Sequence, residues 1–92
     1  MPRSYTPTRE QRAELESLAY WVSDRAWSRE RGKLDEYEDR RTDTTIRAIF
    51  DQLDRLGVPY WVQNTVLHWA EDWRRTMCED LRDAMRARSI IL

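Results

Sequence analysis

The chain has 92 residues, a formal net charge of −1 at neutral pH, and 40% hydrophobic residues against 36% charged ones. This is the size of one small domain, and the apolar share is high enough for a core, which excludes a disordered chain. A net charge near zero gives no field that would steer the protein toward nucleic acid or an anionic membrane.

No run of the sequence approaches the roughly 18 apolar residues of a membrane span, and the N-terminal residues lack the apolar stretch of a signal peptide. Cys78 is the only cysteine, so no internal disulfide can form and a reducing compartment is expected. The composition therefore predicts a soluble, cytoplasmic protein. With only two Gly and three Pro to interrupt regular structure, it should be all-α.

The first predicted helix covers residues 8–31. Thr8 and Gln11 fit a capping box, in which their side chains satisfy backbone N–H groups at the start of a helix. Gly32 suits the left-handed position that ends one. Between these limits the apolar residues recur at helical spacing, at Leu15, Leu18, Val22 and Ala26.

A charged connector is expected over residues 32–43. Within it, residues 34–42 form either a loop or one short, exposed extra helix, and we prefer the helix. Asp43 is a plausible N-cap for a second principal helix over 44–56, whose apolar stripe is Ile46, Ile49, Phe50, Leu53 and Leu56. Gly57 should end that helix, with Val58 as its hydrophobic contact.

The third predicted helix covers residues 59–88, because Pro59 suits a first helical turn and apolar residues continue at helical spacing from Val62 to Ala84. At 1.5 Å per residue it would be a rod of roughly 45 Å. An apolar tail, 89–92, follows. The three helices predict a single small bundle-like domain over 1–92, with Trp69 and Trp73 meeting the stripes of the other two helices in its core.

The first helix is apolar on a second side, where Ala13, Tyr20 and Trp27 recur every seven residues. This second stripe is covered either within the chain, by the charged connector or by the tail 89–92, or by a partner. Tyr and Trp are typical anchors of protein interfaces. The predicted partner-binding residues are therefore the exposed aromatic residues and the apolar tail: Tyr20, Trp27, Trp61, Ile90, Ile91 and Leu92.

The sequence offers little chemistry. His68 and Glu71 could supply two metal ligands, whereas a site needs three or four, so we expect a solvated surface histidine and no metal. Cys78 is expected to be a small core residue. Without a catalytic set or a phosphate-binding loop, no enzyme and no cofactor are predicted.

The predicted function is a non-catalytic protein–protein interaction module that forms a homodimer and binds another protein of unknown identity. The preference for Arg over Lys, fifteen to one, fits an accessory or inhibitor protein from a phage or mobile element of a GC-rich genome. The alternative is a helix-turn-helix-like DNA-binding regulator using residues 46–69. Its groove-facing positions, Tyr60, Trp61 and Asn64, lack the basic residues that usually contact phosphates, so an ordinary helical hairpin is expected.

Overall fold

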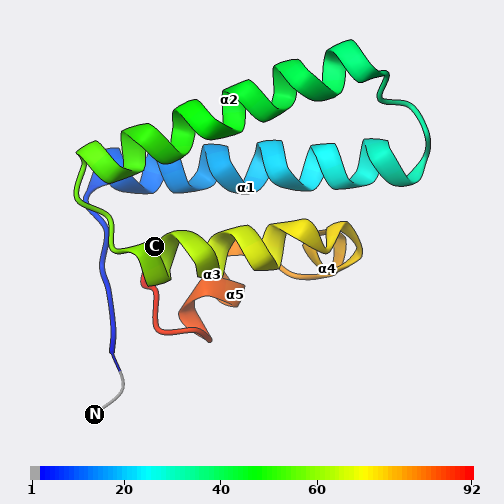
Figure 1. Ribbon diagram of the computed structural model, residues 1–92. Helices are drawn as coiled ribbons and strands as arrows, with labels where there is room; N and C mark the ends of the chain where they lie inside the picture. Colours follow the sequence, from blue (N-terminus) through cyan, green and yellow to red (C-terminus); the bar gives the residue numbers. More distant parts are fainter. Residues whose placement is uncertain (1–2) are drawn as a thin grey trace.

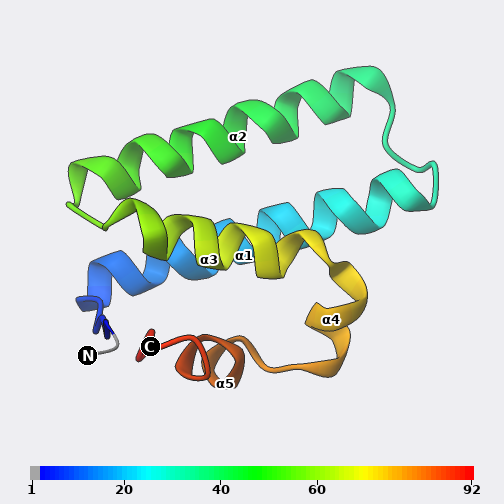
Figure 2. The ribbon, with the colours of Figure 1, turned by 60° about the horizontal axis from the view of Figure 1, so that its bottom comes forward.

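The computed structural model of the protein describes residues 3–92 and is all-α, as the sequence predicts. Helix α1 is the centre of the fold: it packs against α2, α3 and α4 and lies between α2 and α3 in Figure 1. In the turned view of Figure 2, α4 and α5 lie along one side of the molecule below α3. The helices are α1 (Arg9–Glu30), α2 (Glu36–Arg55), α3 (Tyr60–Glu71), α4 (Trp73–Cys78) and α5 (Leu81–Arg86).

The core consists of the apolar stripes expected for the first two helices, together with one face of α3. Leu15, Leu18 and Leu53 are completely buried. Around them lie side chains from every helix of residues 3–92 except α4, which has no buried residue. The buried apolar residues outside these three are Ala19, Val22, Ile46, Ile49, Val58, Val62, Val66, Trp69, Ala70, Ala84, Met85 and Ile90.

The predicted capping box at the start of α1 is confirmed. The backbone N–H of Gln11 donates to Thr8 Oγ1 (3.2 Å), and the N–H of Thr8 donates to Gln11 Oε1 (2.9 Å). The Gln11 side chain also donates to the carbonyl of Leu56 at 2.7 Å. The cap therefore fixes the start of α1 to the end of α2, two points far apart in the sequence.

Both glycines end helices as expected. Gly32 has φ 65° and Gly57 has φ 76°, a left-handed conformation that costs glycine little. After Gly57, the N–H of Val58 donates to the carbonyl of Leu53 (3.0 Å), and the N–H of Gly57 donates to that of Asp54 (3.1 Å). These are the two hydrogen bonds of a Schellman motif, and they turn the chain sharply from α2 into α3.

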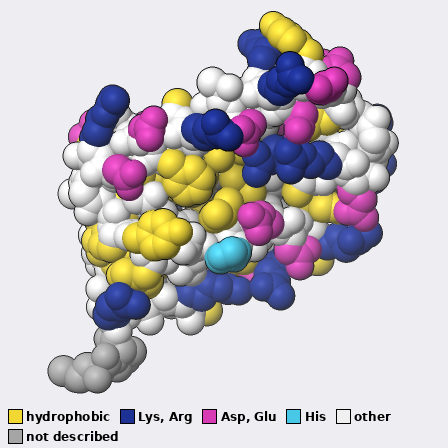
Figure 3. Space-filling view, in the orientation of Figure 1, with side chains coloured by type: hydrophobic (Ala, Val, Ile, Leu, Met, Phe, Trp, Pro, Cys, Tyr) yellow, Lys and Arg dark blue, Asp and Glu magenta, His cyan; other side chains and the backbone are white. Residues whose placement is uncertain are grey.

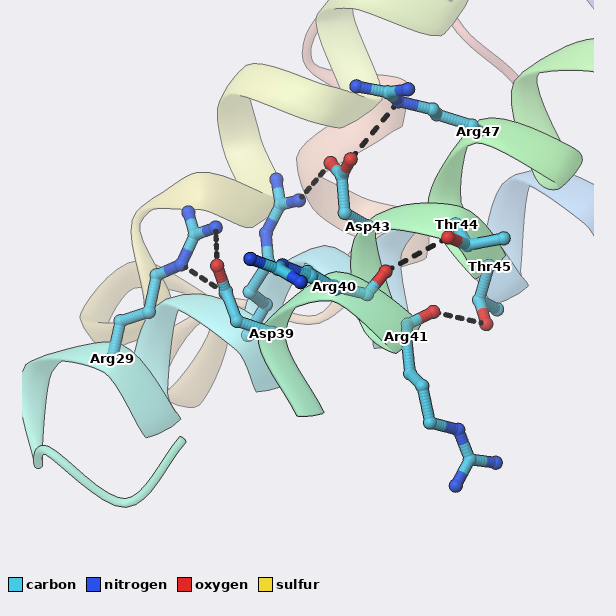
Figure 4. Close-up of polar contacts among 9 residues, drawn as sticks. Arg29, Asp39, Arg40, Arg41, Asp43, Thr44, Thr45 and Arg47 are labelled. Atoms are coloured by element: carbon cyan, nitrogen blue, oxygen red, sulfur yellow. Dashed lines mark hydrogen bonds and ion pairs between the residues drawn. The ribbon is translucent and has the colours of Figure 1, made fainter. Parts of the chain in front are cut away.

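The predicted connector over 32–43 is wrong in most of its length, because residues 36–43 belong to α2. Asp35, not Asp43, is the N-cap, and its carboxylate accepts from the N–H of Glu38. The extra helix expected over 34–42 is thus the first half of α2 itself. Two ion pairs link this half to α1. Arg29 pairs with Asp39 at 2.7 Å (Figure 4), and Arg25 pairs with Asp43 at 3.2 Å.

The predicted single helix over 59–88 is also wrong. The backbone leaves helical geometry at Asp72 (φ −94°, ψ 87°) and again at Glu79 (φ −114°, ψ 141°). At each break an aspartate caps the next helix: Asp72 accepts from the N–H of Arg75, and Asp80 from those of Arg82 and Asp83. The 45 Å rod is replaced by three shorter helices that fold back on the molecule.

Because of these breaks, the predicted core is also wrong in one of its two tryptophans. Trp69, on α3, is buried, with 5% of its surface exposed, and its indole donates to Glu79 Oε2 at 3.1 Å. Trp73 is the first residue of α4 and only half-buried. The two rings therefore do not form the i, i+4 core pair that an unbroken helix would have made.

The residues after α5 return to the start of the chain. Ser89 has φ 69°, and the N–H of Ile90 donates to the carbonyl of Met85 at 2.9 Å. Tyr5 and Ile90 then form a parallel bridge, with hydrogen bonds from Tyr5 N to Ser89 O (2.9 Å) and from Ile91 N to Tyr5 O (2.8 Å). Within residues 3–92, no helix has both the length and the apolar character to cross a membrane.

Candidate protein-binding surface

An open hollow lies between α1 and α4, with a volume of about 190 Å³. We call it the α1–α4 groove. It exists because the chain breaks at Asp72, which lets α4 run back beside the outer side of α1. Its walls are Tyr20, Ser23, Asp24 and Trp27 from α1, and Trp73, Thr76 and Met77 from α4.

Four large side chains dominate the groove. Tyr20 is 62% exposed and Met77 is 74% exposed, so both reach well into solvent. Trp27 and Trp73 are half-buried. A patch of exposed large apolar side chains can mark a site of protein–protein interaction.

Cations hold the two tryptophan rings of the groove. The Arg31 guanidinium lies 4.7 Å from the centre of the Trp27 ring, and the Lys33 ammonium lies 5.8 Å from it. Arg74 lies 4.9 Å from the centre of the Trp73 ring. Contacts of this kind are attractive because the ring face is electron-rich, so they favour the observed orientations of both rings.

Glu30 fastens α4 to α1. Its carboxylate accepts hydrogen bonds from the indole N–H of Trp73 and from the guanidinium of Arg74. Both hydrogen bonds lower the pKa of Glu30, because they favour the ionised carboxylate, and the bond from Trp73 has the larger effect. An ionised Glu30 therefore links the first residues of α4 to the last residue of α1.

The structure brings together only Tyr20 and Trp27 of the residues predicted to bind a partner. Trp61 is at the start of α3, half-buried, with the Arg3 guanidinium 4.6 Å from its ring centre. Ile90 is completely buried and cannot meet a partner, which corrects that assignment. Ile91 is 38% exposed, and Leu92 lines a separate hollow near Glu16.

Trp73, Thr76 and Met77 were missed because the expected continuous helix put Trp73 in the core. A signal was present in the sequence: Asp72 is a good N-cap, and the N–H three residues later is its usual partner. The tail also does not cover the stripe of Tyr20 and Trp27, since Ile90 pairs with Tyr5 instead.

A second apolar area lies on α2 and α3. In Figure 3, hydrophobic side chains reach the surface over α3 and along the strip between α2 and α3. Tyr60, the first residue of α3, is 74% exposed. Other apolar residues of this part of the chain, Phe50, Leu56, Trp61 and Leu67, are partly buried and packed against the core.

The titratable residues form no cluster that could hold a metal ion: residues 3–92 contain no group of three or more His, Cys, Asp or Glu side chains suited to one. His68 is exposed, with Nδ1 3.5 Å from Glu71 Oε2. Cys78 is exposed on α4, so its expected place in the core is wrong.

The residues of the helix-turn-helix alternative lie on α2 and α3, which both pack against α1. Helix α3 contains no Arg or Lys. Asn64 and Trp61 are half-buried, while Gln63 is 2% exposed and bonded to Asp54 and Val58. Phosphate contacts, the largest share of DNA-binding energy, would have to come from other elements.

The α1–α4 groove is lined by residue types that are common in protein interfaces. Tyr, Trp and Met are enriched at protein interfaces, where large rigid rings give contact area at a small entropic cost. No protein-family model, curated protein or solved structure matches the chain.

Proposed function

We propose that the protein is a non-catalytic protein–protein interaction module and that the α1–α4 groove is its binding surface. One observation carries the proposal: Tyr20, Trp27, Trp73 and Met77 come from two helices and surround one open hollow. A small module of this kind acts by binding another protein chain, as an accessory or inhibitor protein does. Its Arg-rich composition is in keeping with a phage or mobile element of a GC-rich genome.

The groove is partly organised before any partner arrives. Arg31 and Lys33 hold the Trp27 ring, and Glu30 holds Trp73. Side chains that are already ordered lose less entropy on binding, which raises affinity for a given contact area. This favours a binding role over a purely structural one for the two tryptophans.

Site-specific photo-crosslinking in the native host tests the proposal. A photo-reactive residue at Met77 should link to a protein partner. The same residue at Tyr60 is a matched control, because both positions are 74% exposed and Tyr60 lies away from the groove. We expect a defined crosslinked band from position 77 that is absent from position 60 and is lost when Trp73→Arg is added. Equal labelling from both positions would contradict the proposal.

A further inference from the structure

The α1–α4 groove is part of a longer stripe on the solvent-facing side of α1. The residues of this stripe are spaced alternately four and three apart, which is the spacing of a coiled-coil seam. None of them is fully buried. The stripe consists of Ala13, Ser17, Tyr20, Asp24, Trp27 and Arg31.

Charged residues lie at both ends of the stripe. Glu16 lies beside one end, in a hollow that Asp80 and Arg82 also line, and all three are exposed. Arg31 and Lys33 lie at the other end, over the Trp27 ring. Within residues 3–92, neither Glu16 nor Arg31 belongs to an ion pair, so each is available to a partner of opposite charge.

We propose that the partner of this face is a second copy of the chain, with the two α1 helices antiparallel about a two-fold axis. This rests on the proposed function of the α1–α4 groove. The register follows from the positions. When Tyr20 lies opposite Trp27 of the second copy, the axis passes between residues 23 and 24. Glu16 then lies opposite Arg31 of the second copy.

One two-fold axis therefore brings Tyr20 to Trp27 and Glu16 to Arg31 of the other copy. Each contact occurs twice, since in a two-fold dimer one patch meets its own copy. Tyr20 of each copy enters the groove of the other at Trp27, beside Met77. The Glu16–Arg31 pair, which forms twice, favours the antiparallel orientation, because a parallel pair would place Glu16 opposite Glu16 and Arg31 opposite Arg31.

The exposed area of the chain agrees with a partner of this kind. The chain exposes 6216 Å², whereas a monomer of this mass typically exposes about 5,700 Å². The molecule has extents of 43 × 30 × 19 Å, so its broad faces are large enough for the roughly 800 Å² that each partner of a standard interface buries.

The position of Asp24 is unfavourable in a dimer of this register. It is exposed on the stripe and lies next to the axis, so the two Asp24 carboxylates of a dimer approach each other. This repulsion weakens the pair. Replacement of Asp24 by Asn should therefore tighten a dimer of this register, whereas it has no effect on the mass of a monomer.

Sedimentation or light scattering of the full chain over a range of micromolar concentrations should give twice the chain mass. Glu16→Arg and Arg31→Glu should each raise the dissociation constant about tenfold, because each reverses two exposed ion pairs per dimer. The double variant, with both charges exchanged, should return close to the wild-type value. Asp24→Asn should lower the dissociation constant. Asp51→Arg, an equally drastic charge change on α2, is the control and should leave it unchanged.

A wild type that remains monomeric, single reversals without effect, or a double variant that fails to recover would each overturn the antiparallel dimer. Circular dichroism separates dissociation from unfolding, since a dissociated chain keeps its helix content. If the protein is monomeric and position 77 still crosslinks to a different protein, the homodimer is wrong and the proposed function stands. If the protein is monomeric and position 77 gives no crosslink, both the homodimer and the proposed function are wrong.

Discussion

The carboxylate of Glu30, the last residue of α1, accepts a hydrogen bond from the indole of Trp73, the first residue of α4. This hydrogen bond, together with the contacts from Arg74, lowers the pKa of Glu30. A carboxylate whose pKa is lower in the folded state stabilises that state above its unfolded pKa, about 4.3 for Glu. The stabilisation is lost as the pH falls through the lowered, folded-state value.

We therefore expect α4 to detach from α1 in acid before the core unfolds. An NMR titration that follows the indole N–H of Trp73 should show its signal moving as Glu30 becomes protonated. In Glu30→Gln that titration should be absent, with the signal already shifted at neutral pH. Asp51→Asn, on the far side of α2, should behave as the wild type. A Trp73 signal that titrates equally in Glu30→Gln would show that another group is responsible.

Trp69 and Trp73 should differ in their contributions to stability. Trp69 is 5% exposed and bonded to Glu79, so Trp69→Ala should lower the free energy of unfolding by about 3–5 kcal/mol. Trp73 is half-buried on α4, and Trp73→Ala should cost only about 1–2 kcal/mol. Chemical denaturation of the two variants measures the difference. Equal losses would place Trp73 in the core after all.

Three helix ends were predicted from residues that lie close together in the sequence. Thr8 and Gln11 form their cap from side chains three residues apart, and Gly57 supplies the left-handed turn by itself. Such signals depend on neighbours in sequence, so no knowledge of the tertiary structure is needed. The start and end of α1 and the end of α2 were located for this reason.

The position of α4 was not predictable from periodicity. Apolar residues continue at helical spacing through Asp72 and Asp80, so the pattern of a single helix persists although the backbone breaks twice. The first half of α2 was expected only as a separate short helix, because its charged residues form no apolar stripe that continues into the second half. Pairing of Asp39 and Asp43 with arginines of α1 stabilises it, and pairs between helices cannot be read from local spacing.

Gln63 should tolerate no negative charge. Its side chain is 2% exposed, and its amide donates to Asp54 Oδ1 (2.9 Å) and to the carbonyl of Val58 (3.0 Å). Gln63→Glu replaces the donor by a buried acceptor facing two other acceptors. We expect it to lower the free energy of unfolding by more than Gln63→Leu, which should cost about 1–3 kcal/mol.

Denaturation curves at neutral and acidic pH distinguish the two Gln63 variants. The difference in stability between them should shrink in acid, where the introduced carboxyl group becomes protonated and regains a donor. A Gln63→Glu variant as stable as Gln63→Leu at neutral pH would mean that the site is open to water.

Ser89 should be improved by glycine. It has φ 69°, a left-handed conformation in which a side chain is strained. Ser89→Gly removes that strain but loosens the unfolded chain, so the net gain should be about 0.5–1 kcal/mol. Thermal unfolding should show a higher midpoint for Ser89→Gly and a lower one for Ser89→Val, because a β-branched residue fits this conformation poorly. A lower midpoint for glycine would show that the serine side chain has a stabilising contact.

Helix α4 has six residues and no buried side chain. Isolated helices shorter than about 12–15 residues are marginal in water, so α4 depends on its contacts with Glu30 and should open locally without the rest of the fold. Its amide hydrogens should exchange with solvent faster than those of α1 and α3. Each opening removes one wall of the α1–α4 groove. The apparent affinity of the groove is then its intrinsic affinity reduced by the fraction of time that α4 is closed, and any bound partner should slow exchange at α4 more than anywhere else in the chain.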